Sequence, residues 1–316
     1  MMSMNGLFLD LAQIFQYQFM QHAFEAGTIV AIVAGIVGYF VVLRRSSFAA
    51  HALSHIGFAG AAGAVLVGAS PVYGLLAFTS LGGVGMAALG QRAEHRDVQI
   101  GTVLAFMLGL GVLFISLYTG YATEAYSILF GQILGISITD VLVTLSISIV
   151  ILFAIAVVYR PLLFASLDED VAEAKGMPML IIGVIFMLLV AVATSIAVQV
   201  VGVLLIFSLM VTPAATAQRL AKRPAHAIAI SVAISLAATW LGLLLAFYEP
   251  YPVSFFITSL VFAFYLFVRF AYPRINPSKV QKAESVELKL AGQSKDTHHD
   301  KTDERTDKTE EHNIED

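Results

Sequence analysis

The lysine and arginine residues of this chain are gathered in five clusters, separated by long stretches without a basic residue. The four stretches between clusters are 46, 63, 43 and 45 residues long and cover Ser46–Gln91, Asp97–Tyr159, Gly176–Gln218 and Pro224–Val268. A transmembrane helix needs about 20 predominantly apolar residues. Each stretch therefore has room for two membrane crossings, and the pattern predicts an all-α, polytopic membrane protein.

The distribution of charge supports this interpretation. The chain is 58% hydrophobic and 13% charged, whereas soluble domains carry about 25% charged residues. Of its 40 charged residues, 19 lie in the last 43, Arg274–Asp316. We therefore expect residues 1–273 to form a membrane domain and residues 274–316 to form a disordered cytoplasmic tail. No basic field predicts nucleic-acid binding, and the absence of cysteine excludes thiolate metal sites.

Because basic clusters remain on the cytoplasmic side, we expect the N-terminus outside, one span before Arg44 and the C-terminus inside. Nine spans are preferred. Eight remain possible, because no turn signal marks Val198–Gln199. Residues 1–22 contain a possible amphipathic helix on the outer face, and Tyr126–Gly135 is apolar but too short to span, which favours an interfacial or re-entrant helix. The expected spans are 24–43, 48–68, 71–89, 100–118, 139–159, 178–197, 199–217, 226–247 and 253–270.

The second expected span is rich in small residues. Ala59 and Gly63, and likewise Gly60 and Ala64, stand four apart, a spacing that lets membrane helices approach closely. We expect this helix to be surrounded by protein and not by lipid.

Two histidines lie on the same helix. His51 and His55 are four residues apart, so both imidazoles share one face. With a helix start near Ser46 they lie roughly 8 and 14 Å into a hydrocarbon core about 30 Å thick. Polar groups at that depth are costly and usually functional. The alternative is that both histidines only form hydrogen bonds with neighbouring helices. The pattern favours instead that they are ligands for zinc or another divalent transition metal.

A short polar segment, 161–178, is expected in the cytoplasm. Ser166 and Glu169 match a capping box, while Gly176 and Pro178 are stop signals. The charges suit the helix dipole, with acids at the start and a lysine at the end. The helix is either a docking element for a soluble partner or a plain surface helix.

No phosphate-binding loop or hydrolase motif is present. We expect a transport subunit and not an enzyme, with no bound cofactor.

In order along the chain, four segments resemble the permease subunit of zinc/manganese-uptake ABC transporters, the ABC-3 family. They are Leu43–Gly60, Ile128–Gly131, Leu167–Pro178 and Val198–Leu205 continuing to Thr212–Thr216. The resemblance covers about Phe19 to Tyr272.

The resemblance implies a homodimer in a bacterial cytoplasmic membrane, a separate cytoplasmic ATP-binding subunit and an extracytoplasmic solute-binding protein that delivers the ion. It also implies that the ATPase docks at Leu167–Met177. The residues we assign to this coupling role are Ser166, Asp168, Glu169, Asp170, Glu173, Lys175 and Gly176.

The sequence departs from the family motif Gly-Asp-Ala-x-Ser-His. His55 matches the motif histidine, but His51 stands where the aspartate is expected, and Ala59 replaces a common proline. Exchange of a carboxylate for an imidazole softens the site, which favours Zn²⁺ over Mn²⁺ as the transported ion. A gradient-driven carrier or channel without an ATPase, and a sensor without transport, are the alternative functions.

Overall fold

The computed structural model describes residues 15–89, 96–118, 131 and 133–275. In these ranges the chain is helical and contains no strand, which confirms the all-α class. Nine of the described helices are long and apolar enough to cross a membrane, so the preferred number of spans is confirmed. They are α2 (Gln18–Leu43), α3 (Ser47–Leu66), α4 (Pro71–Leu89), α5 (Arg96–Leu117), α7 (Ile138–Leu167), α9 (Met179–Val201), α10 (Val203–Leu220), α11 (Pro224–Tyr248) and α12 (Val253–Ile275).

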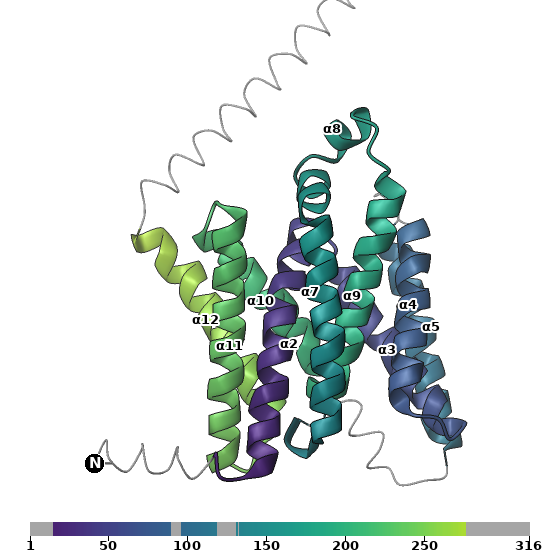
Figure 1. Ribbon diagram of the computed structural model, residues 1–316, viewed down its shortest axis with the longest axis vertical. Helices are drawn as coiled ribbons and strands as arrows, with labels where there is room; N and C mark the ends of the chain where they lie inside the picture. The colour runs from purple at the N-terminus through teal and green to yellow at the C-terminus, as the bar shows by residue number, and fades with distance from the viewer. Residues whose placement is uncertain (1–14, 90–95, 119–130, 132, 276–316) are drawn as a thin grey trace, which may run out of the picture. The chain divides into compact units, whose positions relative to one another are not determined.

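The direction of the helices agrees with the expected topology. The short helix α8 (Glu169–Ala174) and the link between α10 and α11 lie at one end of the bundle, and α2 begins at the other end (Figure 1). The link contains Lys222 and Arg223, and Lys175 directly follows α8. Basic clusters that were assigned to one side of the membrane are therefore found together.

Gly202 separates α9 from α10, so the expected boundary at Val198–Gln199 was wrong. Gly202 adopts φ 84°, a region that residues with a Cβ avoid, and α10 starts at the next residue. Gly131 also has a positive φ and lies against the backbone of Val201 and Gly202. The signal in the sequence was this single glycine within an otherwise apolar run.

Helix α3 is held in the interior, as its small residues predicted. Most of its residues are buried, and it packs against α4, α5, α9 and α10. A Cβ at Gly60 would overlap the carbonyl oxygen of Gly74 in α4, and a Cβ at Gly74 would overlap that of Gly60. The two backbones are therefore in direct contact, which only glycine allows.

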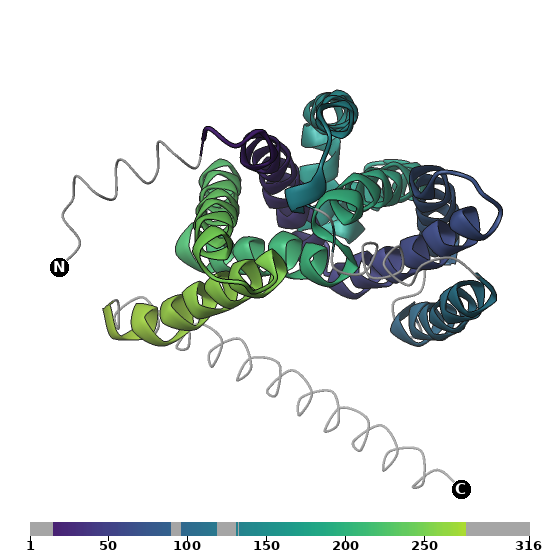
Figure 2. The same cartoon turned by 90° about the horizontal axis from the view of Figure 1, so that it is seen from below.

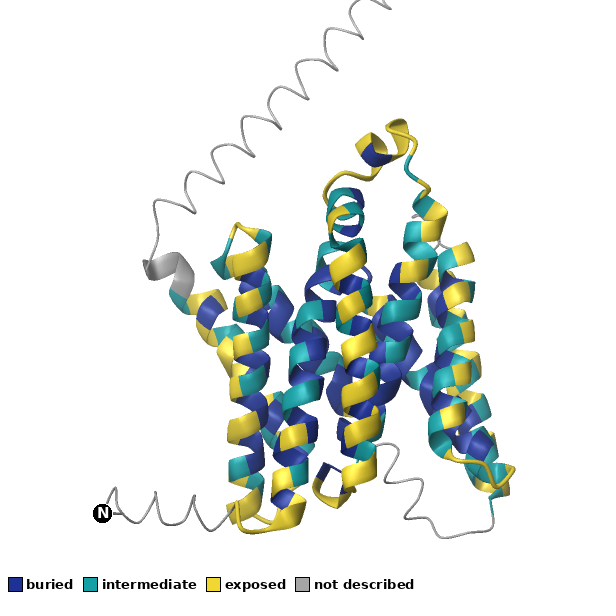
Figure 3. Ribbon diagram, in the orientation of Figure 1, coloured by how far each residue is buried: buried dark blue, intermediate teal, exposed yellow. Residues whose placement is uncertain are grey.

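The neighbouring helices differ in exposure. Seen along the helix axes, α5 lies beside α3 at the edge of the bundle (Figure 2). Helix α7 carries an exposed apolar stripe along its length, while buried residues gather on the helices behind it (Figure 3). We expect such stripes to face lipid, because apolar surface in a bilayer carries no hydrophobic cost.

The start of α7 is fixed by a capping box. Ser137 Oγ accepts a hydrogen bond from the Asp140 N–H, and the Asp140 carboxylate accepts from the Ser137 N–H. The helix then continues through Pro161 to Leu167, eight residues beyond the expected end of the span at residue 159. The capping box expected at Ser166 was wrong, because Ser166 lies inside α7 and its Oγ donates to the Leu162 carbonyl oxygen.

Several expectations fall wholly or partly outside the described residues. These include residues 3–14 of the amphipathic segment, most of Tyr126–Gly135 and the tail from residue 276. Residues 18–22 belong to α2, and a short 3₁₀ helix, η2, covers Ile133–Gly135. The chain divides into two compact units, 1–265 and 266–316. The sites below all lie in the first unit.

Candidate metal pathway

A tight turn places the histidine-bearing helix α3 directly after α2. The Ser46 N–H donates to the Val41 carbonyl oxygen at 2.9 Å and the Arg45 N–H to that of Val42 at 3.1 Å. This is a Schellman motif, which usually has glycine in its left-handed position. Here Arg45 occupies it with φ 53°, at a cost of about 1–2 kcal/mol. The chain thus keeps a charged side chain at a position where glycine would be less strained.

His51 and His55 lie together on α3, as their spacing predicted. Their ring centroids are 4.7 Å apart and the rings are nearly perpendicular, with an interplanar angle of 84°. Both side chains are half-buried. Neighbouring side chains therefore cover the pair in part.

The second wall of this site comes from α10. The ring centroid of Phe207 lies 4.8 Å from that of His51. The Ser54 hydroxyl donates to the His51 carbonyl oxygen at 2.7 Å and makes no bond to the ring. Among the described residues, the buried Nδ1 of His51 has no hydrogen-bond partner. A buried imidazole nitrogen without a partner is costly, and a passing metal ion would satisfy it.

The histidine pair is a small donor set. In the described part of the chain, no group of three or more His, Cys, Asp or Glu side chains is placed to hold a metal ion. Two imidazoles leave further coordination positions open on a tetrahedral ion such as Zn²⁺. Such a site can hold an ion without trapping it, which suits a conduction path.

The segment that we expect in the cytoplasm contains the six-residue helix α8. Asp168 is its N-cap, and its Oδ1 accepts the Val171 N–H at 3.0 Å. Lys175 places its Nζ 5.0 Å from the centroid of the Phe164 ring in α7, and Gly176 ends the helix with φ 75°. The other acids of the expected coupling set, Glu169, Asp170 and Glu173, are exposed.

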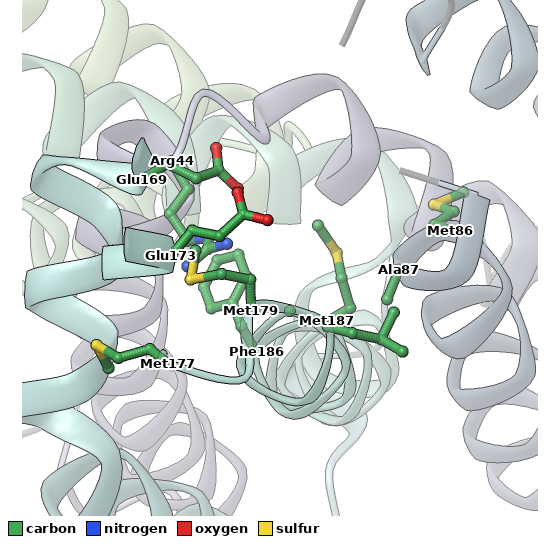
Figure 4. A pocket seen from close by; sticks show the side chains of 11 residues that line it. Arg44, Met86, Ala87, Glu169, Glu173, Met177, Met179, Phe186 and Met187 are labelled. Atoms are coloured by element: carbon green, nitrogen blue, oxygen red, sulfur yellow. The ribbon is translucent and has the colours of Figure 1, made fainter. Parts of the chain in front are cut away.

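A cavity of about 310 Å³ lies beneath α8, at the end of the bundle that we expect to be cytoplasmic. The side chains of Arg44, Glu169 and Glu173 converge on one side of it, while Met86 and Ala87 line the other (Figure 4). Three further methionines, Met177, Met179 and Met187, complete much of the wall. Arg44 was not predicted as a site residue, although it is the first basic residue after a long apolar span and lies just before the histidine helix.

At the end of the bundle opposite α8, the fold brings together two polar residues that are far apart in the sequence. Gln199 of α9 donates from Nε2 to Oδ1 of Asp140 at 3.1 Å. Asp140 thereby links the start of α7 to the end of α9. The two residues are 59 positions apart, so no sequence pattern could have paired them.

Comparison with known proteins decides the family. The family described as the ABC 3 transport family matches residues 16–272, nearly the whole described chain. The chain belongs to the ABC 3 transport family. Relatives of this ABC 3 protein include the manganese transport system membrane protein MntC of Halalkalibacterium halodurans, which is 33% identical over 70% of this chain and 76% of its own length.

Three further likenesses cover more of the chain. The manganese import system permease protein ScaB of Streptococcus parasanguinis is 30% identical over 86% of this chain and 96% of its own length. The solved structure of PsaBC from Streptococcus pneumoniae in complex with Fab superimposes with a TM-score of 0.76 at 30% identity, covering 86% of this ABC 3 chain and all of the compared chain. A metal-chelate type ABC transporter in an inward-facing conformation, 16% identical with a TM-score of 0.60, shares the fold.

Proposed function

We propose that this ABC 3 protein is the membrane permease subunit of an ATP-driven importer that moves a divalent transition-metal ion into the cytoplasm. The single observation that carries the proposal is the contact between His51 and His55 on an interior helix, where a buried ring nitrogen has no hydrogen-bond partner among the described residues. The names of the relatives, which describe manganese transport and import, support a metal ion as the substrate.

His51 and His55 bind the ion in transit through their neutral imidazoles. Water and the second copy of the chain supply the remaining coordination positions, because two imidazoles leave positions open on a tetrahedral ion. The permease therefore acts as a homodimer. Since two nitrogen ligands bind less tightly than a closed four-ligand site, the ion can leave again.

The metal ion is Zn²⁺, with Mn²⁺ as the second choice. Nitrogen donors favour zinc over manganese in the general order of divalent metal affinities. The relatives are named for manganese, whereas the family motif that this chain resembles has an aspartate at the position of His51. Selectivity is tested below with the reverse substitution.

Helix α8 couples transport to a separate cytoplasmic ATPase. Its exposed acids, Glu169, Asp170 and Glu173, form the contact surface, and Asp168 keeps the short helix folded. Ser166, inside α7, has no direct part in capping α8. An extracytoplasmic binding protein delivers the ion at the opposite end. ATP binding and hydrolysis then move α8 and switch access to the histidine pair.

Reconstituted proteoliposomes test the function. We expect Zn²⁺ or Mn²⁺ uptake only when the ATPase, the binding protein and ATP are present. Uptake driven by an ion gradient without the ATPase would contradict the ABC mechanism and favour the carrier alternative.

The role of the histidines is tested in the same vesicles. The double substitution of His51 and His55 by alanine should abolish uptake while the complex still assembles. His226→Ala is the matched control, since His226 is exposed at the start of α11 and should be neutral. Metal uptake retained in the double variant would contradict the assignment of His51 and His55 as metal ligands.

A further inference from the structure

One face of α10 stays partly exposed where it meets the histidine pair. The face is formed by residues spaced three and four apart, while Leu205, Leu209 and Thr216 on the opposite side are buried. Its members are Leu204, Phe207, Ser208, Val211, Thr212 and Ala215. Because Phe207 contacts His51, this face continues the surface on which the histidines lie.

Two hydroxyl groups on this face make no hydrogen bond within the described part of the chain. In membrane helices a serine or threonine commonly donates to the carbonyl oxygen four residues earlier. Thr79, Ser195 and Thr216 do so at 2.7, 2.9 and 2.8 Å. Ser208 and Thr212 are not bonded in this way, so their oxygens are free to meet a ligand.

The back of α10 is fixed, which keeps this face turned outward. Pro213 has no N–H, so the Leu209 carbonyl oxygen loses its helical donor. The hydroxyl group of Ser235 in α11 donates a hydrogen bond to that oxygen instead, at 3.5 Å. On α2, a Cβ at Gly38 would overlap the Met210 carbonyl oxygen, so the two backbones touch there. Both anchors hold the buried side of α10 and leave Ser208 and Thr212 uncovered.

The two hydroxyls lie on the cytoplasmic side of the histidine contact. Helix α10 runs toward the end that carries the Lys222–Arg223 link. Thr212 follows Phe207 by five residues, a rise of about 7.5 Å toward the cytoplasm. An ion that leaves His51 for the cytoplasm therefore meets Ser208 first and Thr212 next.

We propose that Ser208 and Thr212 line the cytoplasmic part of the cation path. Their hydroxyl oxygens coordinate the divalent ion after it leaves His51 and His55. This inference rests on the proposed transport function and adds a second set of contacts to it. Neutral oxygens suit a partly hydrated divalent cation. They carry no charge, so they do not create a deep trap between the histidines and the cytoplasm.

The natural absence of cysteine allows a direct test. Ser208→Cys and Thr212→Cys are made one at a time in the full transporter and treated in inside-out vesicles with a charged, membrane-impermeant thiol reagent. Phe153→Cys is the control, because Phe153 is 69% exposed on the stripe of α7 that we expect to face lipid. We expect the two α10 variants to react at least tenfold faster than the control, and Mn²⁺ or Zn²⁺ to slow the reaction.

Reactivity equal to that of the Phe153→Cys control would overturn the inference and place α10 against lipid. If Mn²⁺ and Zn²⁺ did not slow the reaction of the cysteines with the thiol reagent, the inference would also be overturned, since the path would then hold water but no cation. Parent transporter that takes up neither metal would overturn the proposed function together with this inference, whereas normal uptake with unreactive cysteines would overturn the inference alone.

A second pair of variants distinguishes the effect of the Thr212 hydroxyl group from that of the side-chain volume. Thr212→Val keeps the volume and removes the hydroxyl, while Thr212→Ser keeps the hydroxyl. We expect Thr212→Val to lower the maximal uptake rate by about fivefold with ATP hydrolysis retained, and Thr212→Ser to remain within twofold of the parent. Equal loss in both variants would show a packing role and contradict the proposal.

Discussion

The guanidinium carbon of Arg44 lies 5.3 Å from the centroid of the Phe186 ring, so the end of α2 rests on α9. The same arginine shares a cavity wall with Glu169 and Glu173 of α8. Since α3 begins three residues after Arg44, a displacement of α8 can reach the histidine helix through this side chain.

Arg44→Lys tests this connection. Lysine keeps the charge but loses the planar group that stacks on an aromatic ring. We expect ATP hydrolysis by the complex to continue and metal uptake to fall about tenfold, the effect of a coupling free energy of about 1.4 kcal/mol. Arg45→Lys, at the exposed neighbouring position, serves as the control. A parallel loss of hydrolysis and uptake would indicate impaired assembly and contradict the coupling role.

His51→Asp tests metal choice. The substitution restores a carboxylate, which is a harder ligand than imidazole. We expect the ratio of Mn²⁺ to Zn²⁺ uptake to rise by about tenfold when each ion is supplied with the same binding protein. An unchanged ratio would place selectivity in the binding protein.

Gly60→Ala tests the contact between α3 and α4. The added methyl group meets the Gly74 carbonyl oxygen, and overpacking of this kind costs about 1–3 kcal/mol. We expect a lower unfolding temperature of the purified protein in detergent. Gly85→Ala on α4 is the control, because a Cβ there meets nothing within 4 Å. Equal behaviour of both variants would contradict the close approach.

Asp168→Ala tests the cap of α8. Loss of the bond from the Val171 N–H should destabilise the helix by about 1 kcal/mol, so amide hydrogen exchange in α8 should accelerate about fivefold. Co-purification of the ATPase should weaken in parallel. Asp170→Ala removes the same charge from an exposed position without a capping bond, and its exchange rate should match that of the parent protein.

The membrane architecture could be read from the sequence, because basic residues are excluded from the hydrocarbon core and therefore mark the ends of the spans. The boundary at Gly202 was missed, since a single glycine in an apolar run is also common inside membrane helices. Ser166 was misassigned because α7 continues past Pro161, where a helix is usually expected to end or kink.

The histidine pair was predictable because both residues belong to one helix, so their spacing alone sets their geometry. The contacts of Arg44 with Phe186 and of His51 with Phe207 join different helices. Apolar residues surround membrane helices on all sides, so hydrophobic periodicity does not tell which face meets which neighbour. The α10 face with Ser208 and Thr212 became visible only in the folded chain.

The glycine contact between α3 and α4 has a mechanical consequence. Backbones that touch at Gly60 and Gly74 cannot slide past each other, so the hairpin travels as one piece during the transport cycle. The contact of α3 with α10 includes the rings of His51 and Phe207, which can rotate and separate. A spectroscopic label on the outer surface of α4 would therefore follow the movement of α3, the helix that we propose to bind the metal ion, without coming near the proposed site.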